Sequence, residues 1–514
     1  MSKIHEIVAQ ARWSQEALGS NAWFASQLVR QPLRALQRSL GDDPVGWAEL
    51  IQPPQERTIA ENLAAEVGPL ADACRWLRKQ SSEVLKPRRE GGWFDSLTLR
   101  VERKPLGVVL VIGASNYPLF LLAAPAIQAL AAGNAVLLKP PPGGEAVAEK
   151  LREVLVEGGL DENMCHVLDS SVEAAEAAID ARVDHVVATG SSETGRAVAR
   201  RAAEQLTSCT LECSGNDAVI LLPSADLDRV ASCVAWGLRF NSGATCIAPR
   251  FAFANTEQLD SLEQKLAKQL ADAEPRGVYP QAIDDTRRLV GEAIDSGARV
   301  VSPVGFSRYR LEAACDTGRL PPIVLRFRSQ RPPLFEEAIF SPVFSLIDAS
   351  EHDEETIKIV SKESGVSAEE FKKREDLSSL CEANDSRYAL GASIFGDRSR
   401  SENWAGFSQA GCVTINDLIA PTADPRVPFG GAGESGYGVT RGAEGLLAMT
   451  RPQAIVRRRG RWLPHLDPPT PALEELLSGM IRLKHGSGLA SRWRGVRQFF
   501  SAAREHQQHQ KRER

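Results

Sequence analysis

Short apolar runs alternate with helical segments from residue 106 to residue 206, and this alternation constrains the fold more than any other feature of the chain. The runs typical of strands are Val108–Ile112, Ala135–Leu138, Cys165–Leu168 and His185–Val187. The segments typical of helices are Pro118–Ala132, Glu145–Glu157, Val172–Ile179 and Glu193–Leu206. Such alternation favours a parallel sheet covered on both faces, and ligands bind these sheets beyond the carboxyl ends of the strands. The candidate loops there are Gly113–Pro118, Lys139–Gly144 and Thr189–Gly195.

The regions on either side differ in character. Residues 1–85 favour helices joined by loops, as in Pro53–Lys79, where apolar residues recur at helical spacing. Lys86–Lys104 is basic and contains a glycine pair and an alternating stretch, which predicts a β-hairpin. A second α/β region extends from about residue 216 to residue 423. Within it Glu351–Leu380 is densely charged, and we expect a solvated helix pair or a mobile insertion there.

Length, charge and cysteine usage exclude several classes of protein. The 514 residues suffice for two or three domains, and the net charge of −5 gives no overall field for nucleic acid. The nine cysteines form no disulfide framework, and Cys209 and Cys213 lack the partners of a zinc site. We therefore predict no metal site and a reduced, cytoplasmic environment. The apolar stretch Leu106–Ala132 contains Gly113, Pro118 and Pro125, so a strand, a loop and a helix describe it better than a membrane span.

Cys246 has the most informative local sequence, Asn241–Arg250 (NSGATCIAPR). Small and polar residues, with a glycine close before the cysteine, suit a thiol presented on a tight loop. Sulfur is intrinsically nucleophilic, and Glu212, which ends an apolar segment upstream, is a candidate general base. The alternative is a buried structural cysteine, the commoner fate of a single cysteine.

Other short motifs lie where a ligand is expected. Asn116 has an amide that can donate to a developing oxyanion, although a turn or cap asparagine is the alternative. Lys139 ends a strand, where a lysine can reach ribose hydroxyls or a phosphate. Gly190 and Ser191 precede a helix whose free amides suit a pyrophosphate, but the loop is neither GxGxxG nor a Walker loop. Pro428–Gly438 is dense in glycine, and a flexible surface loop is its alternative interpretation.

Together and in this order, these motifs resemble the aldehyde dehydrogenase superfamily over roughly residues 1–460. The resemblance is carried by Asn-x-Pro after the first strand, Lys-Pro after the second, Thr-Gly-Ser, the Leu-Glu segment, Asn-x-Gly-x-x-Cys and Pro-Phe-Gly-Gly…Ser-Gly-x-Gly. Phe340-Ser341-Pro342-Val343 looks like the family's Phe-Gly-Pro-Val, with serine in place of glycine.

The resemblance implies an activity and a role for each motif residue. The activity is oxidation of an aldehyde to the carboxylic acid, with NAD as the expected cofactor and NADP as the second choice. Cys246 would attack the carbonyl to give a thiohemiacetal, hydride loss would leave a thioester, and Glu212 would activate the water that hydrolyses it. Asn116 and the backbone N–H of Cys246 would stabilise the oxyanion. The implied cofactor contacts are Lys139, Gly190, Ser191, Ser115, Phe340 and Glu337.

Three departures from the family pattern bear on these roles. Ala244 stands where the family usually has glutamine. Ala338 stands where the family has a glutamate that binds the nicotinamide ribose, so either a small bulge restores Glu337 or that contact is lost. Pro142 replaces a glutamate that NAD-preferring members often carry, which leaves the choice of dinucleotide open.

The resemblance further implies an α/β fold with a Rossmann-type parallel-sheet cofactor domain, an α/β catalytic domain and a β-hairpin oligomerisation arm. The expected ranges are 1–85 and 105–213 for the cofactor domain, 214–425 for the catalytic domain, 86–104 and 450–460 for the arm, 426–449 for a segment returning to the cofactor domain, and 461–514 for a C-terminal extension. A homo-oligomer, a dimer or a tetramer, is implied. The extension mixes Trp493, Phe499 and Phe500 with arginines, which suits either a peripheral contact with an anionic membrane and an apolar aldehyde, or a helix packed on the protein's own surface.

Two rival functions stay open at this point. A CoA-acylating relative passes the acyl group to CoA rather than water, but such members generally lack the glutamate base, so Glu212 argues against it. The other rival is a family-fold protein kept for structural or partner-binding reasons. Ala244 and Ala338 keep that rival alive, although Cys246 and its two catalytic partners are intact. The identity of the aldehyde cannot be read from the sequence.

Overall fold

The structure is a computed structural model that describes residues 3–91, 97–327, 333–348, 375–458, 466 and 469–513. It comprises two compact units, the first made of Met1–Arg88 and Val101–Ala454 and the second of Arg89–Arg100 and Ile455–Arg514. Residues 351–374 of the charged stretch lie outside the described residues, and the rest of it begins α18 (Glu375–Asn384).

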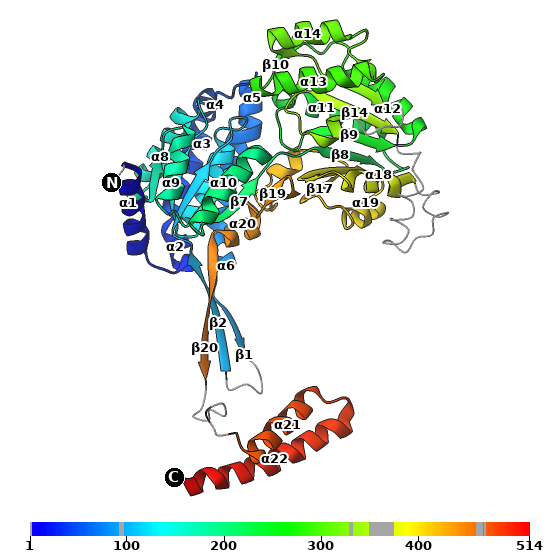
Figure 1. Cartoon of the computed structure of the whole chain (residues 1–514). Coiled ribbons are helices and arrows are strands. Elements are labelled where there is room, and N and C mark those ends of the chain that lie inside the picture. The colour runs from blue at the N-terminus through cyan, green and yellow to red at the C-terminus, as the bar shows by residue number, and fades with distance from the viewer. Residues whose placement is uncertain are drawn as a thin grey trace. The chain divides into compact units, whose positions relative to one another are not determined.

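The first large sheet of unit 1 confirms the parallel α/β arrangement expected from the strand–helix alternation (Figure 1). Its order is β19-β7-β6-β3-β4-β5, and only β19 runs antiparallel to its neighbour. The strands are β3 (Val108–Ile112), β4 (Ala135–Lys139), β5 (Cys165–Val167), β6 (His185–Thr189), β7 (Ser208–Glu212) and β19 (Gly436–Tyr437). Strands β3 and β4 are buried along their whole length, as in a sheet covered on both faces.

Four helices follow the strands of this sheet. They are α7 (Phe120–Ala131), α8 (Glu145–Glu157), α9 (Val172–Asp180) and α10 (Ser192–Glu204). The chain order of the strands moves outward from β3 in one direction through β4 and β5, and in the other through β6 and β7. The loops after β3 and β6 therefore flank a crevice at the carboxyl edge of the sheet, where doubly wound folds bind their ligands.

The second large sheet has the order β11-β13-β14-β9-β8-β16-β17 and is parallel except for β11. Its strands are β8 (Asp217–Leu221), β9 (Pro249–Ala254), β11 (Arg299–Ser302), β13 (Ile323–Phe327), β14 (Val343–Asp348), β16 (Gly391–Phe395) and β17 (Cys412–Ile415). The helices between them are α11 (Leu227–Arg239), α12 (Thr256–Gln269), α13 (Ile283–Asp295), α14 (Arg308–Thr317), α15 (Pro333–Glu336) and α19 (Arg398–Ala405). Alternate residues of its strands enter two separate apolar clusters, so this sheet also buries both faces.

The N-terminal region is helical as expected, but its longest predicted helix is wrong in one respect. The N-terminal helices are α1 (Lys3–Leu18), α2 (Ala22–Leu28), α3 (Arg30–Asp42), α4 (Pro44–Glu49), α5 (Ile59–Asn62) and α6 (Gly68–Val84). A π-helical turn, η1 (Leu63–Val67), separates α5 from α6, so Pro53–Lys79 is not one regular helix. Within Pro53–Lys79 the first helical residue is Ile59, because Thr58 and Glu61 form a capping box that starts α5.

The glycine-dense segment Pro428–Gly438 is held by strand pairing to unit 1, although Ala432, Gly433 and Tyr437 within it are exposed. Gly436 pairs with Glu212 across β19 and β7, and a Cβ on Gly436 would lie 2.1 Å from the carbonyl oxygen of Leu211. A Cβ on Gly430 would lie 2.2 Å from the carbonyl oxygen of Gly438. Backbone passes this closely only where side chains are absent, which explains the glycine content. Helix α20 (Gly442–Ala448) then returns Leu446 to the core of the first sheet.

Unit 2 includes parts of a three-stranded sheet and a helical hairpin. The sheet has the order β1-β2-β20, with β1 (Arg88–Gly91), β2 (Leu97–Pro105) and β20 (Thr450–Arg458). Residues 92–96 of the expected Lys86–Lys104 hairpin lie outside the described residues. Helices α21 (Pro471–His485) and α22 (Gly488–Glu513) pack so closely that a Cβ on Gly479 would lie 2.6 Å from the backbone nitrogen of Phe499.

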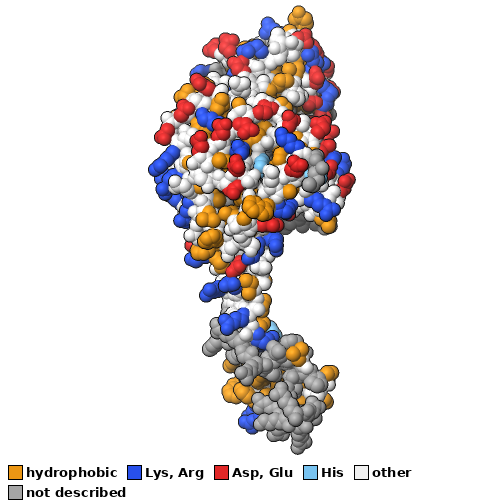
Figure 2. All heavy atoms as spheres, turned by 90° about the vertical axis from the view of Figure 1, so that its left-hand side faces the viewer, with side chains coloured by type: hydrophobic (Ala, Val, Ile, Leu, Met, Phe, Trp, Pro, Cys, Tyr) orange, Lys and Arg blue, Asp and Glu red, His pale blue; other side chains and the backbone are white. Residues whose placement is uncertain are grey.

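Side-chain chemistry at the surface agrees with the near-neutral composition. Acidic and basic side chains are interspersed over the face of unit 1 that Figure 2 shows, an arrangement that does not favour binding of a polyanion. All nine cysteines are free thiols. Over the described ranges, none of the helices has the length and apolarity that a membrane crossing requires.

Candidate active site

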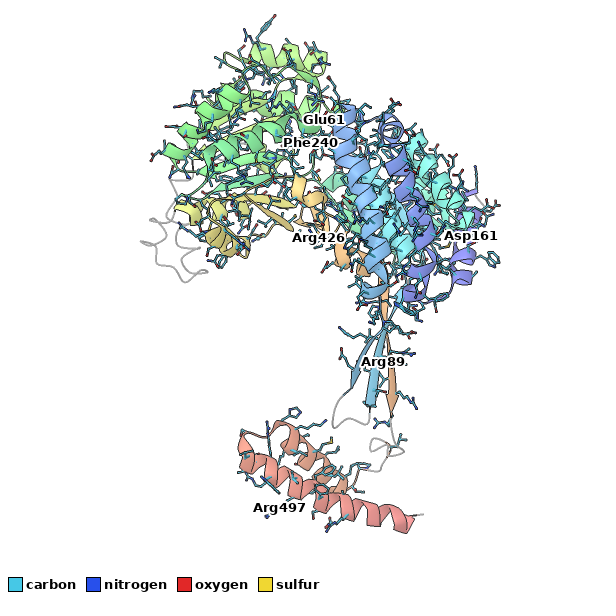
Figure 3. The ribbon with its side chains drawn as sticks, turned by 180° about the vertical axis from the view of Figure 1, so that it is seen from behind. Glu61, Arg89, Asp161, Phe240, Arg426 and Arg497 are labelled. Carbon is cyan, nitrogen blue, oxygen red and sulfur yellow. The ribbon has the colours of Figure 1, made fainter. Side chains whose placement is uncertain are left out.

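The loop that presents Cys246 has an unusual backbone. Asn241, Ser242 and Gly243 are consecutive and all left-handed, with φ of 53°, 50° and 73°. Only glycine adopts this region freely, so the other two residues must be held there by contacts. Glu61 accepts a 3.0 Å hydrogen bond from the backbone nitrogen of Asn241, and the Ser242 hydroxyl donates to the Glu56 carbonyl. Figure 3 shows Glu61 beside Phe240, at the start of this loop.

Cys246 lies between two cavities and lines both. The polar cavity, of about 220 Å³, is lined by Ala114, Asn116, Leu121, Thr189, Gly190, Ser191, Glu212, Cys213, Ser214, Cys246, Tyr279, Gln281, Ala282, Asp285, Ala338 and Phe340. The aromatic cavity, of about 160 Å³, is lined by Ala64, Ala65, Tyr117, Phe120, Leu121, Trp236, Phe240, Thr245, Cys246, Ile247, Ile419, Ala420, Thr422, Ala423, Phe429 and Arg441. A thiol at this junction can react with one molecule while a second molecule occupies the neighbouring cavity.

Glu212 lines the polar cavity together with Cys246. It is the last residue of β7, held between Thr189 of β6 and Gly436 of β19. Burial raises the pKa of its carboxyl, while Arg441 and a hydrogen bond from the Thr440 hydroxyl act in the opposite direction. A carboxylate with a raised pKa is a better proton acceptor than an exposed one, which suits a general base.

The resting thiol of Cys246 is protonated. Burial raises its pKa to about 12, the neighbouring Asp217 and Glu212 add to that rise, and Arg441 lowers it. A nucleophilic thiolate at neutral pH therefore requires that a base accept the proton as the reaction begins.

Asn116 is fixed beside Cys246 by buried contacts. Its side-chain amide nitrogen donates to the carbonyl oxygen of Ala244 over 3.0 Å, and its backbone carbonyl oxygen accepts from Gln55 and Arg57. An amide nitrogen carries two hydrogens, so one is left to donate to an oxyanion. The contact with Ala244 uses its backbone carbonyl, so it does not depend on the side chain at position 244.

Two of the sequence-predicted cofactor residues meet at the N-terminus of α10. Gly190 and Ser191 line the polar cavity, and the Ser191 hydroxyl caps the helix by accepting from the Thr194 backbone nitrogen. A Cβ on Gly190 would approach Thr194 to 3.2 Å, so glycine keeps this entrance open. Free amides at the start of a 13-residue helix suit the negative charge of a pyrophosphate. Phe340 lines the same cavity, so three of the predicted cofactor residues meet there.

Three other predicted cofactor residues do not line the polar cavity. Lys139 ends β4 and is buried, which lowers its pKa, with Asp169 and Glu145 near enough to oppose that shift. The Ser115 hydroxyl bonds the Tyr279 hydroxyl over 2.7 Å. Glu337 forms an ion pair with Arg288 over 2.6 Å, and its neighbour Ala338 lines the cavity instead.

Several residues of the site were missed by reasoning from the sequence. Tyr117 lies inside the quoted Gly113–Pro118 loop, and its hydroxyl bonds the Thr245 hydroxyl over 2.6 Å. Thr440 and Arg441 directly follow the glycine-dense segment. Their position within or directly after a recognised motif was the available signal, but only tertiary packing shows that Tyr117 contacts Thr245 and that Thr440 contacts Glu212.

Comparison with known proteins agrees with this geometry. A family model described as "Aldehyde dehydrogenase family" matches residues 2–369 and 366–455. A 4,4'-diapolycopene aldehyde oxidase from Methylomonas sp is 30% identical over 84% of this chain and 79% of its own length. The dimeric NADP-preferring aldehyde dehydrogenase of Mus musculus is 29% identical over 89% of this chain and 95% of its own length. The NAD+ complex of a Mycobacterium tuberculosis aldehyde dehydrogenase superimposes with a TM-score of 0.74 at 25% identity, covering 90% of this chain and 92% of that one.

Proposed function

Because the chain belongs to the aldehyde dehydrogenase family, we propose that it oxidises an aldehyde to the carboxylic acid with NAD or NADP through a covalent adduct on Cys246. One observation supports this proposal most directly. Cys246 lines both the polar and the aromatic cavity, and Glu212 lines the polar cavity beside it. The first sheet and its helices would bind the cofactor, and the second sheet would carry the nucleophile loop.

The residues of the site then have the following tasks. Cys246 loses its proton to a base as its sulfur attacks the aldehyde carbon held in the aromatic cavity, and the resulting oxyanion accepts from the Asn116 amide. A nicotinamide held by the residues that line the polar cavity would supply the hydride acceptor. Loss of a hydride from the thiohemiacetal leaves a thioester on Cys246. Glu212 takes a proton from the water that attacks this thioester, and the acid is released.

The electrostatics at Lys139 favour NAD over NADP. Lys139 alone would attract a 2′-phosphate, but two carboxylates, Asp169 and Glu145, lie near enough to influence it. Asp169 is exposed and carries a lowered pKa because Ser171 hydrogen bonds stabilise its anion, so it stays negative at neutral pH. This negative charge would repel a 2′-phosphate placed at Lys139.

A panel of aldehydes tests the proposed activity directly. The enzyme is mixed with NAD or NADP and aldehydes from short to long chain, and the reduced cofactor is followed by absorbance. We expect turnover without CoA. Turnover only when CoA is added would support the acylating alternative, and a chain that reduces neither cofactor with any aldehyde would support the non-catalytic one.

We also propose that the chain forms a homo-oligomer through the sheet β1-β2-β20. A small ribbon of strands is marginally stable alone in water, and its edge strands present unpaired backbone groups. Val456 on the edge strand β20 is largely exposed, which supports pairing with a second copy.

The helical hairpin of unit 2 supports a peripheral contact with an anionic membrane. Leu489, Trp493 and Phe500 of α22 are exposed, and helix geometry places them within about 40° of one another around the axis. Arg492 and Arg497 flank this apolar stripe, as basic residues do on helices that lie in a lipid interface.

Co-sedimentation with vesicles containing anionic lipid tests the membrane contact. We expect Trp493→Ser and Phe500→Ser to weaken binding, whereas Trp13→Ser, which alters an exposed tryptophan of α1, leaves it unchanged. Equal sedimentation before and after removal of residues 466–514 would refute this part of the proposal.

A further inference from the structure

Arg441 is a buried cation in a cavity whose walls are otherwise mostly apolar. Only 9% of this residue is exposed. The cavity around it has an aromatic lining, contributed by Tyr117, Phe120, Trp236, Phe240 and Phe429. Burying a guanidinium in such surroundings costs free energy unless other groups compensate its charge. The groups that contact Arg441 therefore indicate its role.

The protein satisfies this cation incompletely. Its Nη1 donates to the carbonyl oxygen of Thr422 over 2.6 Å, and the guanidinium carbon lies 4.1 Å from the ring centre of Phe429 and 5.6 Å from that of Phe120. Within the described ranges, no carboxylate lies within 4.0 Å of the guanidinium, although Glu212 acts on it from a greater distance, and Nε and Nη2 have no hydrogen-bond partner. Buried arginines are normally paired with an acid, so this one has capacity left for an anionic ligand.

The backbone at Arg441 adds a second, independent sign of a functional position. Its φ of 58° and ψ of 174° lie in a region that is essentially reserved for glycine. The backbone nitrogen donates to the Gln128 side chain over 2.8 Å, which helps to hold the strained residue. Strain of this kind persists where the side chain is needed in one place, and here that place is the wall of the aromatic cavity.

We propose that the aldehyde substrate carries a carboxylate remote from its carbonyl, and that Nε and Nη2 of Arg441 bind this carboxylate while the aromatic walls hold a flat carbon skeleton. The proposal rests on the proposed aldehyde oxidation and assigns the substrate class of that same site. The cavity of about 160 Å³ resembles in volume a cavity that accepts benzene, roughly 150 Å³, so one ring is the size expected. The stacked rings of Trp236 and Phe240, 4.7 Å apart, offer a flat wall.

Matched substrates test this assignment. The probes are 3- and 4-carboxybenzaldehyde, each compared with the formylbenzamide of the same ring position, which has nearly the same shape without the charge. We expect kcat/KM to favour the carboxylate by roughly tenfold to hundredfold, the range of a hydrogen bond between charged groups. Arg441→Met should abolish this preference, and turnover of the amide should fall as well, because Arg441 also acts on Cys246 and Glu212. The preference is therefore measured as the ratio of the two kcat/KM values within each protein. Arg426→Met removes an exposed arginine of a nearby segment, labelled in Figure 3, and should change neither.

Two results would overturn the assignment. Equal kcat/KM for the charged and neutral probes in the unaltered enzyme is one. An equal loss for both probes in Arg441→Met is the other, because it would mean that Arg441 acts on Cys246 or Glu212 rather than on the substrate. If Arg441→Met does not fold, Arg441→Gly replaces it, since glycine adopts this backbone without strain.

A binding measurement separates this proposal from the proposed function. Alkylation of Cys246 by iodoacetamide is followed by peptide mass spectrometry with terephthalate or with neutral terephthalamide present. We expect terephthalate alone to protect Cys246, and to lose this effect in Arg441→Met. If terephthalate protects Cys246 from alkylation but the protein oxidises no aldehyde, the carboxylate site is supported and the proposed oxidation is rejected. If the protein oxidises neutral aldehydes but terephthalate does not protect Cys246, the oxidation is supported and the carboxylate site is rejected.

Discussion

At the scale of single residues, the site is built to keep Cys246 protonated until a substrate arrives. Burial and two neighbouring carboxylates stabilise the neutral thiol, with a pKa of about 12, and Arg441 is the buried positive charge that offsets them. The same arrangement limits adventitious oxidation, because the thiolate is the reactive form.

The pH dependence of alkylation follows from this pKa. Below about 12 the thiolate fraction of Cys246 rises about tenfold for each pH unit. We therefore expect the rate of iodoacetamide labelling at Cys246, without ligands, to rise steadily from pH 7 to pH 10. A rate that levels off near pH 7 would show that the resting enzyme holds a thiolate.

Glu212→Gln should separate the two halves of the reaction. Glutamine keeps the shape but cannot take a proton from water, and general-base catalysis contributes roughly 10²–10⁴-fold. We expect a burst of reduced cofactor of up to one equivalent per site, followed by slow turnover with the acyl-enzyme visible by intact mass. A slowed burst would instead assign Glu212 to the activation of the thiol. Turnover at the unaltered rate would remove Glu212 from the mechanism.

The raised pKa of Glu212 gives this step a pH signature. Only the deprotonated carboxyl can accept the proton, so deacylation should fall as pH decreases through a value above 4.5, the ordinary value for glutamate. At pH values below this transition, the burst of reduced cofactor should still appear, although steady-state turnover is lost. Identical acid limbs in the unaltered enzyme and Glu212→Gln would contradict this assignment.

Arg250 positions the nucleophile loop from within the second sheet. It is buried, and it donates to the carbonyl oxygens of Gly243 over 2.7 Å and Ser341 over 2.6 Å. It thus joins the loop before Cys246 to the segment that carries Phe340. Arg250→Met should lower kcat strongly and weaken NAD binding, measured by fluorescence titration, because both loops lose their shared donor. Arg299→Met, which removes an exposed arginine of β11, is the control.

At the scale of elements, the turn η1 places a buried ion pair under the loop that carries Asn116. Arg57 bonds Glu66 over 2.9 Å with both side chains almost fully buried, and Glu66 also accepts from the backbone nitrogens of Leu119 and Phe120 at the start of α7. Arg57 in turn donates to the carbonyl of Asn116. A regular helix through residues 63–67 would rotate Glu66 away from α7, since a π-turn inserts one extra residue.

Arg57→Met should therefore destabilise the fold as well as the site. Removing one partner of a buried pair leaves the other charge uncompensated and costs about 3–5 kcal/mol. Denaturant unfolding measures the loss, and Arg201→Met, at an exposed pair with Asp180, should change the midpoint little. A similar midpoint for both variants would mean that the Arg57–Glu66 pair does not stabilise the fold.

The sequence could predict elements whose pattern is local. Strand β3 and helix α8 have the predicted bounds, because an uninterrupted apolar run defines one and Gly158 ends the other. Cys246, Glu212 and Asn116 were found from motifs, and the structure brings all three to the polar cavity. The turn η1, the left-handed run at Asn241 and the position of Arg441 arise from contacts between distant segments, so no local pattern reports them.

At the scale of the whole molecule, the edge of β20 should govern assembly. Val456→Lys places a charge on the exposed edge strand and should increase the monomer fraction measured by light scattering at micromolar concentration. Val304→Lys, at an exposed site in unit 1, should leave the mass unchanged. A strictly monomeric unaltered chain would remove the proposed oligomer altogether.

The pairing of β19 with β7 also determines when, during synthesis, the first sheet can be completed. Glu212 is synthesised long before Gly436, its partner across the sheet. The apolar core of this sheet also includes residues from both ends of unit 1, from Val8 to Met449. A nascent chain that has just emerged with residues 1–213 therefore has an open sheet edge at β7 and a gap in its core. Most of the remaining protein must be translated before that edge is covered. We expect emergence of β19 from the ribosome, rather than emergence of the earlier strands of this sheet, to mark the moment when Glu212 acquires its final surroundings.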